Sequence, residues 1–177
     1  DRPSIVEDQR FAARRPDVLV FKTEILENDL TIAGAIDLNL WFSTNKSAAD
    51  VVVKLVDVFP SVDDNVNKAD MEIGNRHELV RWGVLRGRFR ESMSKPKAFV
   101  PNQPTEIGFE LYDVLHTFKR GHKLQIQIQS SMFPFLDLNP QNYVENIFNA
   151  KESDFTRAFH TIYHNDEHQS SISFNVL

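Results

Sequence analysis

The sequence predicts an all-β fold, an antiparallel β-sandwich of the jelly-roll type with long loops and little helix. Segments in which apolar and polar residues alternate recur along the chain, and this period of two is typical of half-buried strands. The 14 phenylalanines, set against only six glycines, favour a β-rich core. Long polar connections separate the alternating segments and no helical pattern recurs between them, which disfavours an α/β fold.

Length and composition limit the class of protein. A chain of 177 residues suits a single domain with one core. Asp and Glu outnumber Lys and Arg by 25 to 20, so the net charge of −5 provides no basic field for nucleic acid. The absence of cysteine excludes a disulfide framework and a cysteine nucleophile. No apolar run approaches the roughly 20 residues that cross a bilayer, so we expect neither a nucleic-acid partner nor a membrane partner.

The first part of the chain contains three predicted strands after a lead-in. Residues 1–16 are polar and arginine-rich without a sustained period, and we expect them to be extended. Residues 18–23 form a first apolar run. Residues 30–43 form a longer one with apolar side chains at alternate positions, and Gly34 within it indicates a bulge or a kink. Residues 51–59 are the most apolar strand, which a proline ends.

Further strands follow in the middle of the chain. Residues 79–91 are predicted as a strand, on which Arg86, Arg88 and Arg90 would share one face and need solvent or acidic partners. Residues 105–111 are expected to form another strand. Residues 114–120 are interpreted as a short connection to the strand that follows.

Residues 123–129 alternate most regularly. Leu124, Ile126 and Ile128 point to one side, which we expect to be buried, and the glutamines between them form a polar face. A strand with such a pattern is expected to be central in its sheet. Residues 170–176 alternate in the same way and are predicted as the last strand.

The sharpest metal-like signal is the spacing of His160, His164 and His168. On a helix these side chains would share one face and could bind zinc, with Asp166 or Glu167 nearby. Residues 155–163 fit a helical face and a strand face equally well. If His160 lies in a strand and the other two histidines flank a hairpin turn, the imidazoles scatter. The polar turn residues favour this second arrangement.

The other candidate sites carry weaker signals. His77, His116 and His122 stand alone, and we expect capping or surface positions for them. Trp41, Trp82, Phe133 and Phe135 could form a sugar-stacking platform, but core and interface positions explain them more simply. A calcium-binding loop or a solvated turn could be formed by Asp63, Asp64, Asn65, Asn67 and Asp70. Their spacing does not fit the twelve-residue calcium-binding motif, so a solvated turn is the expected structure. Since no G-x-S-x-G elbow occurs either, we predict no catalytic, cofactor-binding or metal-ligating residue.

Several longer segments carry a family resemblance. Six of them are RPDVLVF at 15–21, VVKLVDVFP at 52–60, LRGRFRES at 85–92, FKRGHKL at 118–124, QSSMFPFLDLNP at 129–140 and IYHNDEH at 162–168. In this order they resemble, over essentially the whole chain, the C-terminal domain that follows the catalytic domain in X-prolyl dipeptidyl peptidases, cocaine esterase and related acylases. Residues 7–19 and 139–151 are most similar to the α-amino-acid ester hydrolase and glutaryl-cephalosporin acylase branch.

The resemblance implies that residues 1–177 are a single jelly-roll domain from a longer serine hydrolase. An upstream α/β-hydrolase domain would then supply the Ser-His-Asp triad that forms an acyl-enzyme, so the chain alone is expected to be inactive. Its expected work is to pack on that catalytic domain, to shape substrate access and to support homo-oligomers. The resemblance also makes residues 155–163 a strand and favours an extracytoplasmic location.

Two departures from the family accompany this resemblance. Leu138 stands where relatives commonly have arginine, so an ion pair made by that arginine is not expected here. The sandwich of such enzymes often begins upstream of the lead-in, and the fragment can therefore lack an opening strand.

Two alternatives from other classes remain open on the sequence. A free-standing carbohydrate-binding module uses the same architecture, and it would need coplanar exposed aromatic rings or a groove supported by calcium. A metal-dependent sandwich enzyme would need the three histidines at 160, 164 and 168 to converge.

Overall fold

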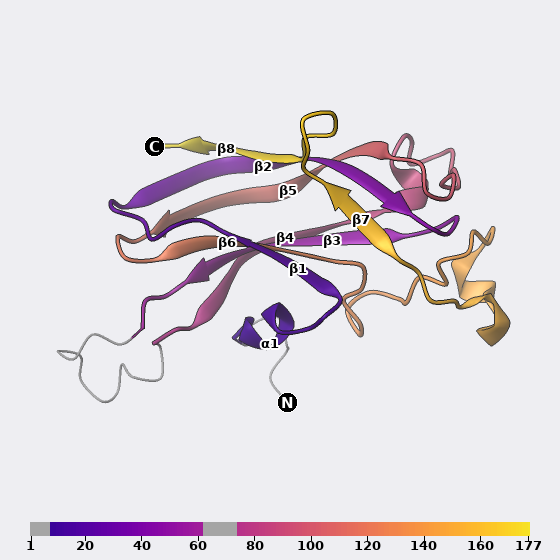
Figure 1. Ribbon diagram of the computed structural model, residues 1–177, viewed down its shortest axis with the longest axis horizontal. Coiled ribbons are helices and arrows are strands. Elements are labelled where there is room, and N and C mark those ends of the chain that lie inside the picture. The colour runs from indigo at the N-terminus through magenta and orange to yellow at the C-terminus, as the bar shows by residue number, and fades with distance from the viewer. Residues whose placement is uncertain (1–7, 62–73) are drawn as a thin grey trace.

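The computed structural model describes residues 8–61 and 74–177, and it consists of two antiparallel sheets packed face to face (Figure 1). The strands are β1 (Val18–Lys22), β2 (Leu30–Thr44), β3 (Asp50–Val58), β4 (His77–Arg86), β5 (Thr105–Phe118), β6 (Lys123–Gln129), β7 (His160–Tyr163) and β8 (Ser171–Val176). The helical segments are short: α1 (Arg10–Ala13), η2 (Gly87–Phe89), η3 (Ile147–Asn149) and η4 (Glu152–Asp154). The prediction of an all-β antiparallel sandwich is confirmed, and its jelly-roll type stays a prediction.

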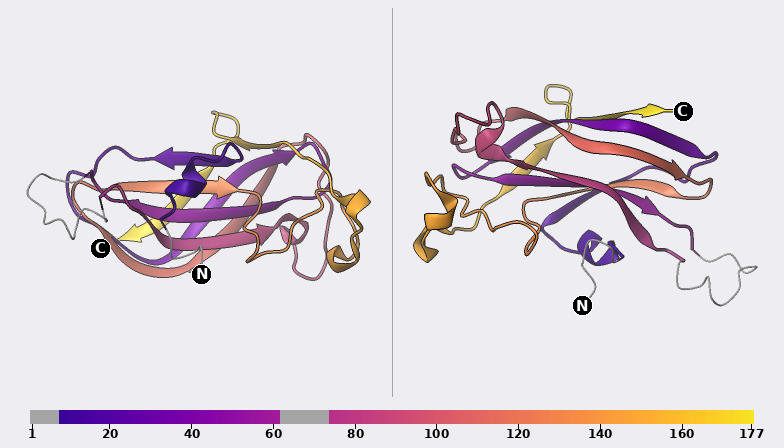
Figure 2. Two further views of the ribbon diagram at one scale, coloured as in Figure 1. Left: turned by 90° about the horizontal axis from the view of Figure 1, so that it is seen from below. Right: turned by 180° about the vertical axis from the view of Figure 1, so that it is seen from behind.

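The strand order explains the two sides of the molecule. One sheet has the order β1-β6-β3-β4, and in the other β2 lies between β5 and the pair β7 and β8. β7 pairs with one end of β2 and β8 with the remainder, so these two short strands follow one another along the same edge. Figures 1 and 2 show β1 and β7 on one side of the sandwich and β4 and β5 on the opposite side. Among the described residues no helix is long and apolar enough to cross a membrane.

The core lies between the inner faces of the two sheets. Apolar residues at alternate positions of β3 and β6 point inward and meet those of β2 and β5. The fully buried residues include Ile32, Ile36, Val53, Leu55, Leu111 and Phe118. Burying each such aliphatic or aromatic side chain contributes roughly 1.5 to 3 kcal/mol, so these alternating positions supply most of the favourable free energy of folding.

β6 is central, as predicted, but its polar face is not exposed. Gln125 and Gln127 are completely buried on the outer face of the sheet. The lead-in covers them: α1 lies across this face (Figure 2, left), and the Gln127 side-chain amide donates to the backbone carbonyl of Gln9 at 3.2 Å. Ala12 of α1 is also buried. The expectation of an extended lead-in is therefore wrong for the described residues from 8 onward, which form a small helical cover.

Two strand boundaries also differ from the prediction. β5 runs without a break through residues expected to be a connection, because a bulge resets its alternation. Val114 pairs with Gly34 and Leu111 with Ile36, so β5 carries two residues where β2 carries one. Gly34 has a φ of +89°, and the predicted bulge there is confirmed. β4 stops at Arg86, where the chain turns into η2, and the following Gly87 packs too closely for a side chain: a Cβ atom there would lie 2.6 Å from the carbonyl oxygen of Ala49.

A lysine is buried beneath the lead-in. Lys54 of β3 is only 3% exposed, and its ammonium donates to the side-chain oxygen of Gln9 at 2.9 Å. Burial, with the nearby charge of Arg15, lowers the pKa of Lys54 to about 8 from 10.5. Since the folded state binds this proton more weakly than the unfolded state, the charge disfavours folding below pH 8, and the penalty disappears between pH 8 and 10.5.

Lys54→Met is expected to raise the free energy of unfolding at pH 7 by about 1 to 3 kcal/mol, because an apolar chain of similar length replaces a buried charge. Urea unfolding at pH 7, 8, 9 and 10 measures this. The gain over the unchanged protein should shrink as the pH rises. Lys119→Met serves as the control, since Lys119 is 61% exposed and should change stability little. A Lys54→Met protein that is less stable at pH 7 would show that the buried charge of Lys54 does not disfavour folding.

Candidate functional site

Three regions of the sandwich bring polar or exposed apolar side chains together. Arginines bind loops at one end, a histidine and aspartate cluster lies at the other end, and a groove opens between the sheets along the edge formed by β1, β7 and β8.

At the end of the sandwich where β3 begins, Arg86, Arg88 and Arg90 contact the surrounding loops, which we term the arginine loops. Arg88 donates to the carbonyl oxygens of Val144 and Glu145 at 2.8 and 2.9 Å, and its guanidinium carbon lies 4.6 Å from the ring centre of Tyr143. Arg86 lies 3.4 Å from a carboxylate oxygen of Asp50. The sequence predicts that Arg86, Arg88 and Arg90 share one strand face. This prediction is wrong, because β4 ends at Arg86 and the chain turns into η2.

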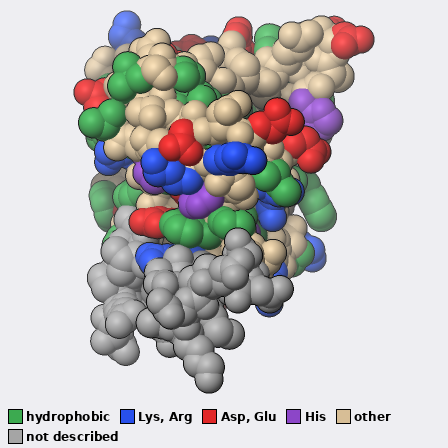
Figure 3. All heavy atoms as spheres, turned by 90° about the vertical axis from the view of Figure 1, so that its left-hand side faces the viewer, with side chains coloured by type: hydrophobic (Ala, Val, Ile, Leu, Met, Phe, Trp, Pro, Cys, Tyr) green, Lys and Arg blue, Asp and Glu red, His purple; other side chains and the backbone are tan. Residues whose placement is uncertain are grey.

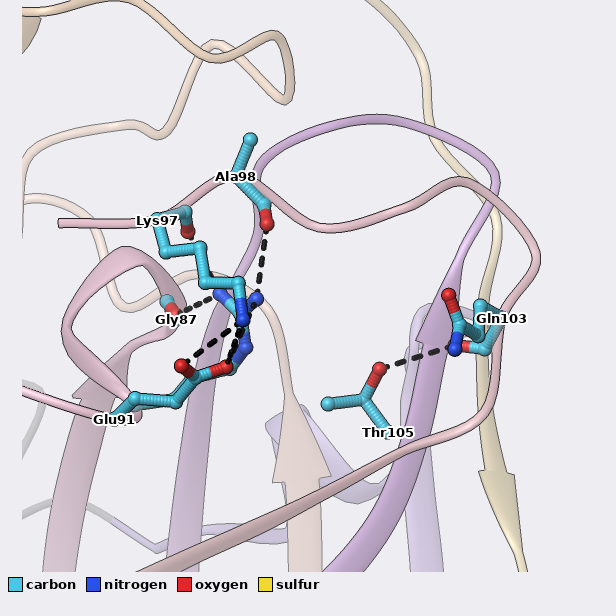
Figure 4. A network of polar contacts seen from close by, with 7 residues as sticks. Gly87, Glu91, Lys97, Ala98, Gln103 and Thr105 are labelled. Atoms are coloured by element: carbon cyan, nitrogen blue, oxygen red, sulfur yellow. Dashed lines mark hydrogen bonds and ion pairs between the residues drawn. The ribbon is translucent and has the colours of Figure 1, made fainter.

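Arg90 forms the centre of a second set of contacts. Its guanidinium donates to the carbonyl oxygens of Gly87, Lys97 and Ala98 at 3.0, 2.7 and 2.9 Å, and lies over the ring of Phe99 at 4.2 Å. Figure 4 shows the carbonyl groups of Gly87 and Ala98 converging on one point, with the ion pair of Lys97 and Glu91 beside them. The same view includes the hydrogen bond from Thr105 to the carbonyl of Gln103. These arginines thus bind the protein's own loops.

The segment around Leu138 is held by the polar contacts of its neighbours. Leu138 is 48% exposed. Its neighbours make the contacts: Asn139 donates to Asp50 at 2.8 Å, and Asp137 lies 3.9 Å from Arg86. Burial raises the pKa of Asp50, while Arg86 and Asn139 act in the opposite direction.

A histidine and aspartate cluster closes the core at the opposite end. Asp57 is the last inward-pointing residue of β3, after Val53 and Leu55, and its side chain is 3% exposed. His116 Nε2 lies 2.9 Å from one of its carboxylate oxygens, and His122 Nδ1 lies 2.8 Å from the other. The cluster therefore joins β3 and the start of β6 to β5 of the other sheet. Figure 3 shows this end, where histidines lie among side chains of both charges.

The cluster satisfies its own hydrogen bonds. Both carboxylate oxygens of Asp57 are occupied by imidazoles, and none of the hydrogen bonds of these imidazoles in the described part of the chain goes to a hydroxyl. No group of three or more His, Cys, Asp or Glu side chains within residues 8–61 and 74–177 has the arrangement of a metal site. The geometry is that of a polar brace between the sheets, and it lacks the nucleophile that a catalytic His-Asp pair would activate.

The sequence predicts that His77, His116 and His122 stand alone, and this prediction is wrong for His116 and His122, which both contact Asp57. A signal was present for residues 57 and 122, because residue 57 continues the inward positions 53 and 55 and residue 122 precedes the inward positions 124, 126 and 128. Residue 116 gave none, because the bulge in β5 reverses the alternation after Leu111. His77 was expected at the surface or as a cap. It is instead 8% exposed beneath the lead-in, where burial lowers its pKa.

The histidines at 160, 164 and 168 lie apart, as the hairpin alternative predicted. His160 lies in β7, and the other two flank the turn that leads to β8. Each ring packs on a different aromatic side chain. The ring-centre distances are 5.3 Å for His160 and Phe42, 6.3 Å for His164 and Phe21, and 4.5 Å for His168 and Trp41. Burial lowers the pKa of His160.

The remaining candidate residues form no common site in the described structure. Trp41 lies in β2 and Trp82 in β4, which belong to different sheets, and Phe133 and Phe135 lie in the loop after β6. The aromatic residues therefore do not form one stacking platform. The acidic segment with Asp63, Asp64, Asn65, Asn67 and Asp70 lies outside the described residues.

An open-edge groove, as we term it, separates β1 from β7 and β8. Leu19 and Phe21 pair with Ile128 and Ile126 and so point inward, yet they are 46% and 42% exposed because none of the described strands of the other sheet covers them. Two hollows of about 340 and 400 Å³ adjoin here, and both are lined by Ile128 and Ile162. The first hollow is mainly apolar. The second also contains charged or polar side chains, among them Asp17, Asp50, Arg157 and His160.

The opposite edge differs. Arg81 of β4 donates to the backbone carbonyl of Asp113 in β5, and Gly83 lies so close to Leu111 that a Cβ atom would approach it to 2.6 Å. A broad hollow of about 680 Å³ lies beside β4, with Arg81 and Glu110 among its lining residues. The two sheets are therefore joined along the edge of β4 and β5 and separated along the edge of β1.

Comparison with known proteins identifies relatives along nearly the whole chain. Residues 1–173 match the family described as the X-Pro dipeptidyl-peptidase C-terminal non-catalytic domain. Cocaine esterase from Rhodococcus sp. (strain MB1 Bresler) is 28% identical over 170 residues, which are 96% of this chain and 27% of the esterase.

Solved structures extend this comparison. A selenomethionine-labelled α-amino acid ester hydrolase superposes with a TM-score of 0.91 and is 45% identical over 98% of this chain. An aminopeptidase from a marine sediment archaeon, Thaumarchaeota archaeon, gives the same TM-score at 37% identity over 98% of the chain. The match covers 28% of each of these two proteins, so this chain spans little more than a quarter of their length.

Asp57→Ala is expected to lower the free energy of unfolding by about 2 to 4 kcal/mol, because it leaves two partly buried imidazoles without an acceptor. Denaturant unfolding at neutral pH measures the change. Asp29→Ala is the matched control: Asp29 also pairs with a cation, Lys119, but its side chain is 50% exposed, and the loss should be much smaller than for Asp57→Ala. Equal losses of unfolding free energy for the two variants would show that the cluster of Asp57, His116 and His122 does not stabilise the fold.

Proposed function

Because the chain belongs to the family of X-Pro dipeptidyl-peptidase C-terminal non-catalytic domains, we propose that it is the non-catalytic part of a longer serine hydrolase. In that enzyme it packs on an α/β-hydrolase domain and shapes the path of substrate to the active site. Residues 1–177 act as one domain in this proposal. The carrying observation is the family match over 173 residues to a domain described as non-catalytic.

The lengths of the relatives support a separation of the enzyme into a catalytic part and a non-catalytic part. The esterase and the ester hydrolase are hydrolases, and their matched parts amount to 27% and 28% of their chains. The groups that break bonds in such proteins then belong to the unmatched part. The open-edge groove supports a docking role as well, since an exposed apolar strand edge is a surface that proteins ordinarily cover.

The same relatives support a proposal for the chemistry of the parent enzyme. We propose acyl transfer to water through an acyl-enzyme, with a serine nucleophile, a histidine base and an aspartate supplied by the catalytic domain. Esters or amides of amino acids are the substrate class that the names of the relatives suggest. The Asp57 cluster does not replace that triad, because both histidines engage one carboxylate and no hydroxyl in the described structure.

The purified chain by itself is expected to show no hydrolysis of aminoacyl esters or of X-Pro dipeptide substrates, because in this proposal the nucleophile belongs to the catalytic domain. Release of a chromogenic leaving group measures this, and the full-length parent enzyme serves as the active control. Turnover by the isolated chain that a serine-directed fluorophosphonate abolishes would overturn the proposal. Turnover that this reagent leaves intact would overturn it too, since a different reactive group would then be present.

A further inference from the structure

Both sheets end in unpaired strands along the open-edge groove. β1 pairs with β6 through residues 18–22, and its other side has no strand partner in the described structure. β7 and β8 pair with β2 alone among the described strands. The groove is thus flanked by two free strand edges, whose backbone N–H and C=O groups can bind a further strand.

The groove also leaves part of the core uncovered. Leu19 and Phe21 of β1 have exposures of 46% and 42%, whereas their partners on the same face, Ile128 and Ile126, are 8% and 9% exposed. The difference arises at the edge itself, because β1 extends beyond the cover that β7 and β8 provide. An extended segment with an apolar side chain at every second position would bury these two residues and pair with β1 at the same time.

The residues that line the two hollows suit the binding of such an extended segment. The first, of about 340 Å³, is lined mainly by apolar side chains such as Ile126 and Ile162. The second, of about 400 Å³, includes Gln129 and His160, and within the described structure Gln129 Oε1 and His160 Nδ1 are buried without a hydrogen-bond partner. A peptide backbone offers donors and acceptors beside apolar side chains, which a purely apolar ligand does not.

We propose that an extended segment of the catalytic part of the same polypeptide lies in the open-edge groove, pairs with the free edge of β1 and inserts apolar side chains against Leu19 and Phe21. This inference rests on the proposed function and identifies the surface through which the two parts join. Pairing along the five residues of β1 would span about 17 Å.

Chain length favours this occupant over a second copy. In the solved relatives nearly three quarters of the polypeptide lies outside the matched region, and it is covalently joined to that region. A tethered segment competes at an effective concentration on the order of 1 mM, whereas a second copy must bind from its bulk concentration. Self-pairing of β1 is therefore the weaker competitor at ordinary protein concentrations.

Hydrogen exchange tests the surface without mutation. In the full-length parent enzyme, the amides of β1 are expected to exchange on the order of tenfold more slowly than in the isolated chain. Amides of β4, on the opposite edge, should change little. Samples of the isolated chain at two concentrations tenfold apart should give equal exchange in β1.

Substitution in the full-length enzyme provides the second test. Phe21→Glu places a charge in the groove and should remove most of the added protection of β1. Leu115→Glu is the control, because Leu115 of β5 is 75% exposed on the outer face of the other sheet. The isolated Phe21→Glu chain should keep the melting temperature within a few degrees, since residue 21 is already exposed.

The outcomes separate this inference from the proposed function. Unprotected β1 amides together with protection elsewhere on the sandwich would overturn the groove as the docking surface and leave the proposed function standing. A sandwich that shows no added protection anywhere in the parent enzyme would overturn both. Protection of β1 that grows with the concentration of the isolated chain would identify a second copy as the occupant and overturn the inference.

Discussion

The structure depends on the contact between the apolar inner faces of its two sheets. The same alternation that buries Val53 and Leu55 determines where every other side chain points. Where the alternation continues beyond the apolar residues, it carries Asp57 and two histidines into the end of the core. Where one sheet extends past the other, it leaves Leu19 and Phe21 facing inward and only partly covered. Both notable surfaces are thus consequences of one packing arrangement.

Much of the fold could be predicted from alternation alone, because apolar side chains at every second position are typical of strands with one buried face. The features that could not be predicted from the alternation also have physical explanations. The sequence of β6 shows that its glutamines share a face, but whether that face meets water depends on α1, a distant segment with no pattern of its own. The continuity of β5 depends on a bulge opposite Gly34, which breaks the alternation at a point where the pattern alone predicts the end of a strand.

The candidate sites were less predictable than the strands. The separation of His160, His164 and His168 followed correctly from polar turn residues, which are a local signal. The Asp57 cluster requires the register between three strands, which no single segment contains. The open-edge groove requires knowledge of which strands lie at the edges of both sheets. The family resemblance supplied the non-catalytic role directly, and the match over residues 1–173 confirms it.

The arginine loops have a consequence for how this end of the domain can evolve. Arg88 and Arg90 bind mostly backbone carbonyl oxygens, and a carbonyl is the same whatever side chain its residue carries. Loop residues such as Lys97, Ala98 and Val144 can therefore be exchanged while the loops keep their course. Substitutions at these loop positions can therefore change the shape and the charge of this end of the domain, provided that Arg88 and Arg90 are retained.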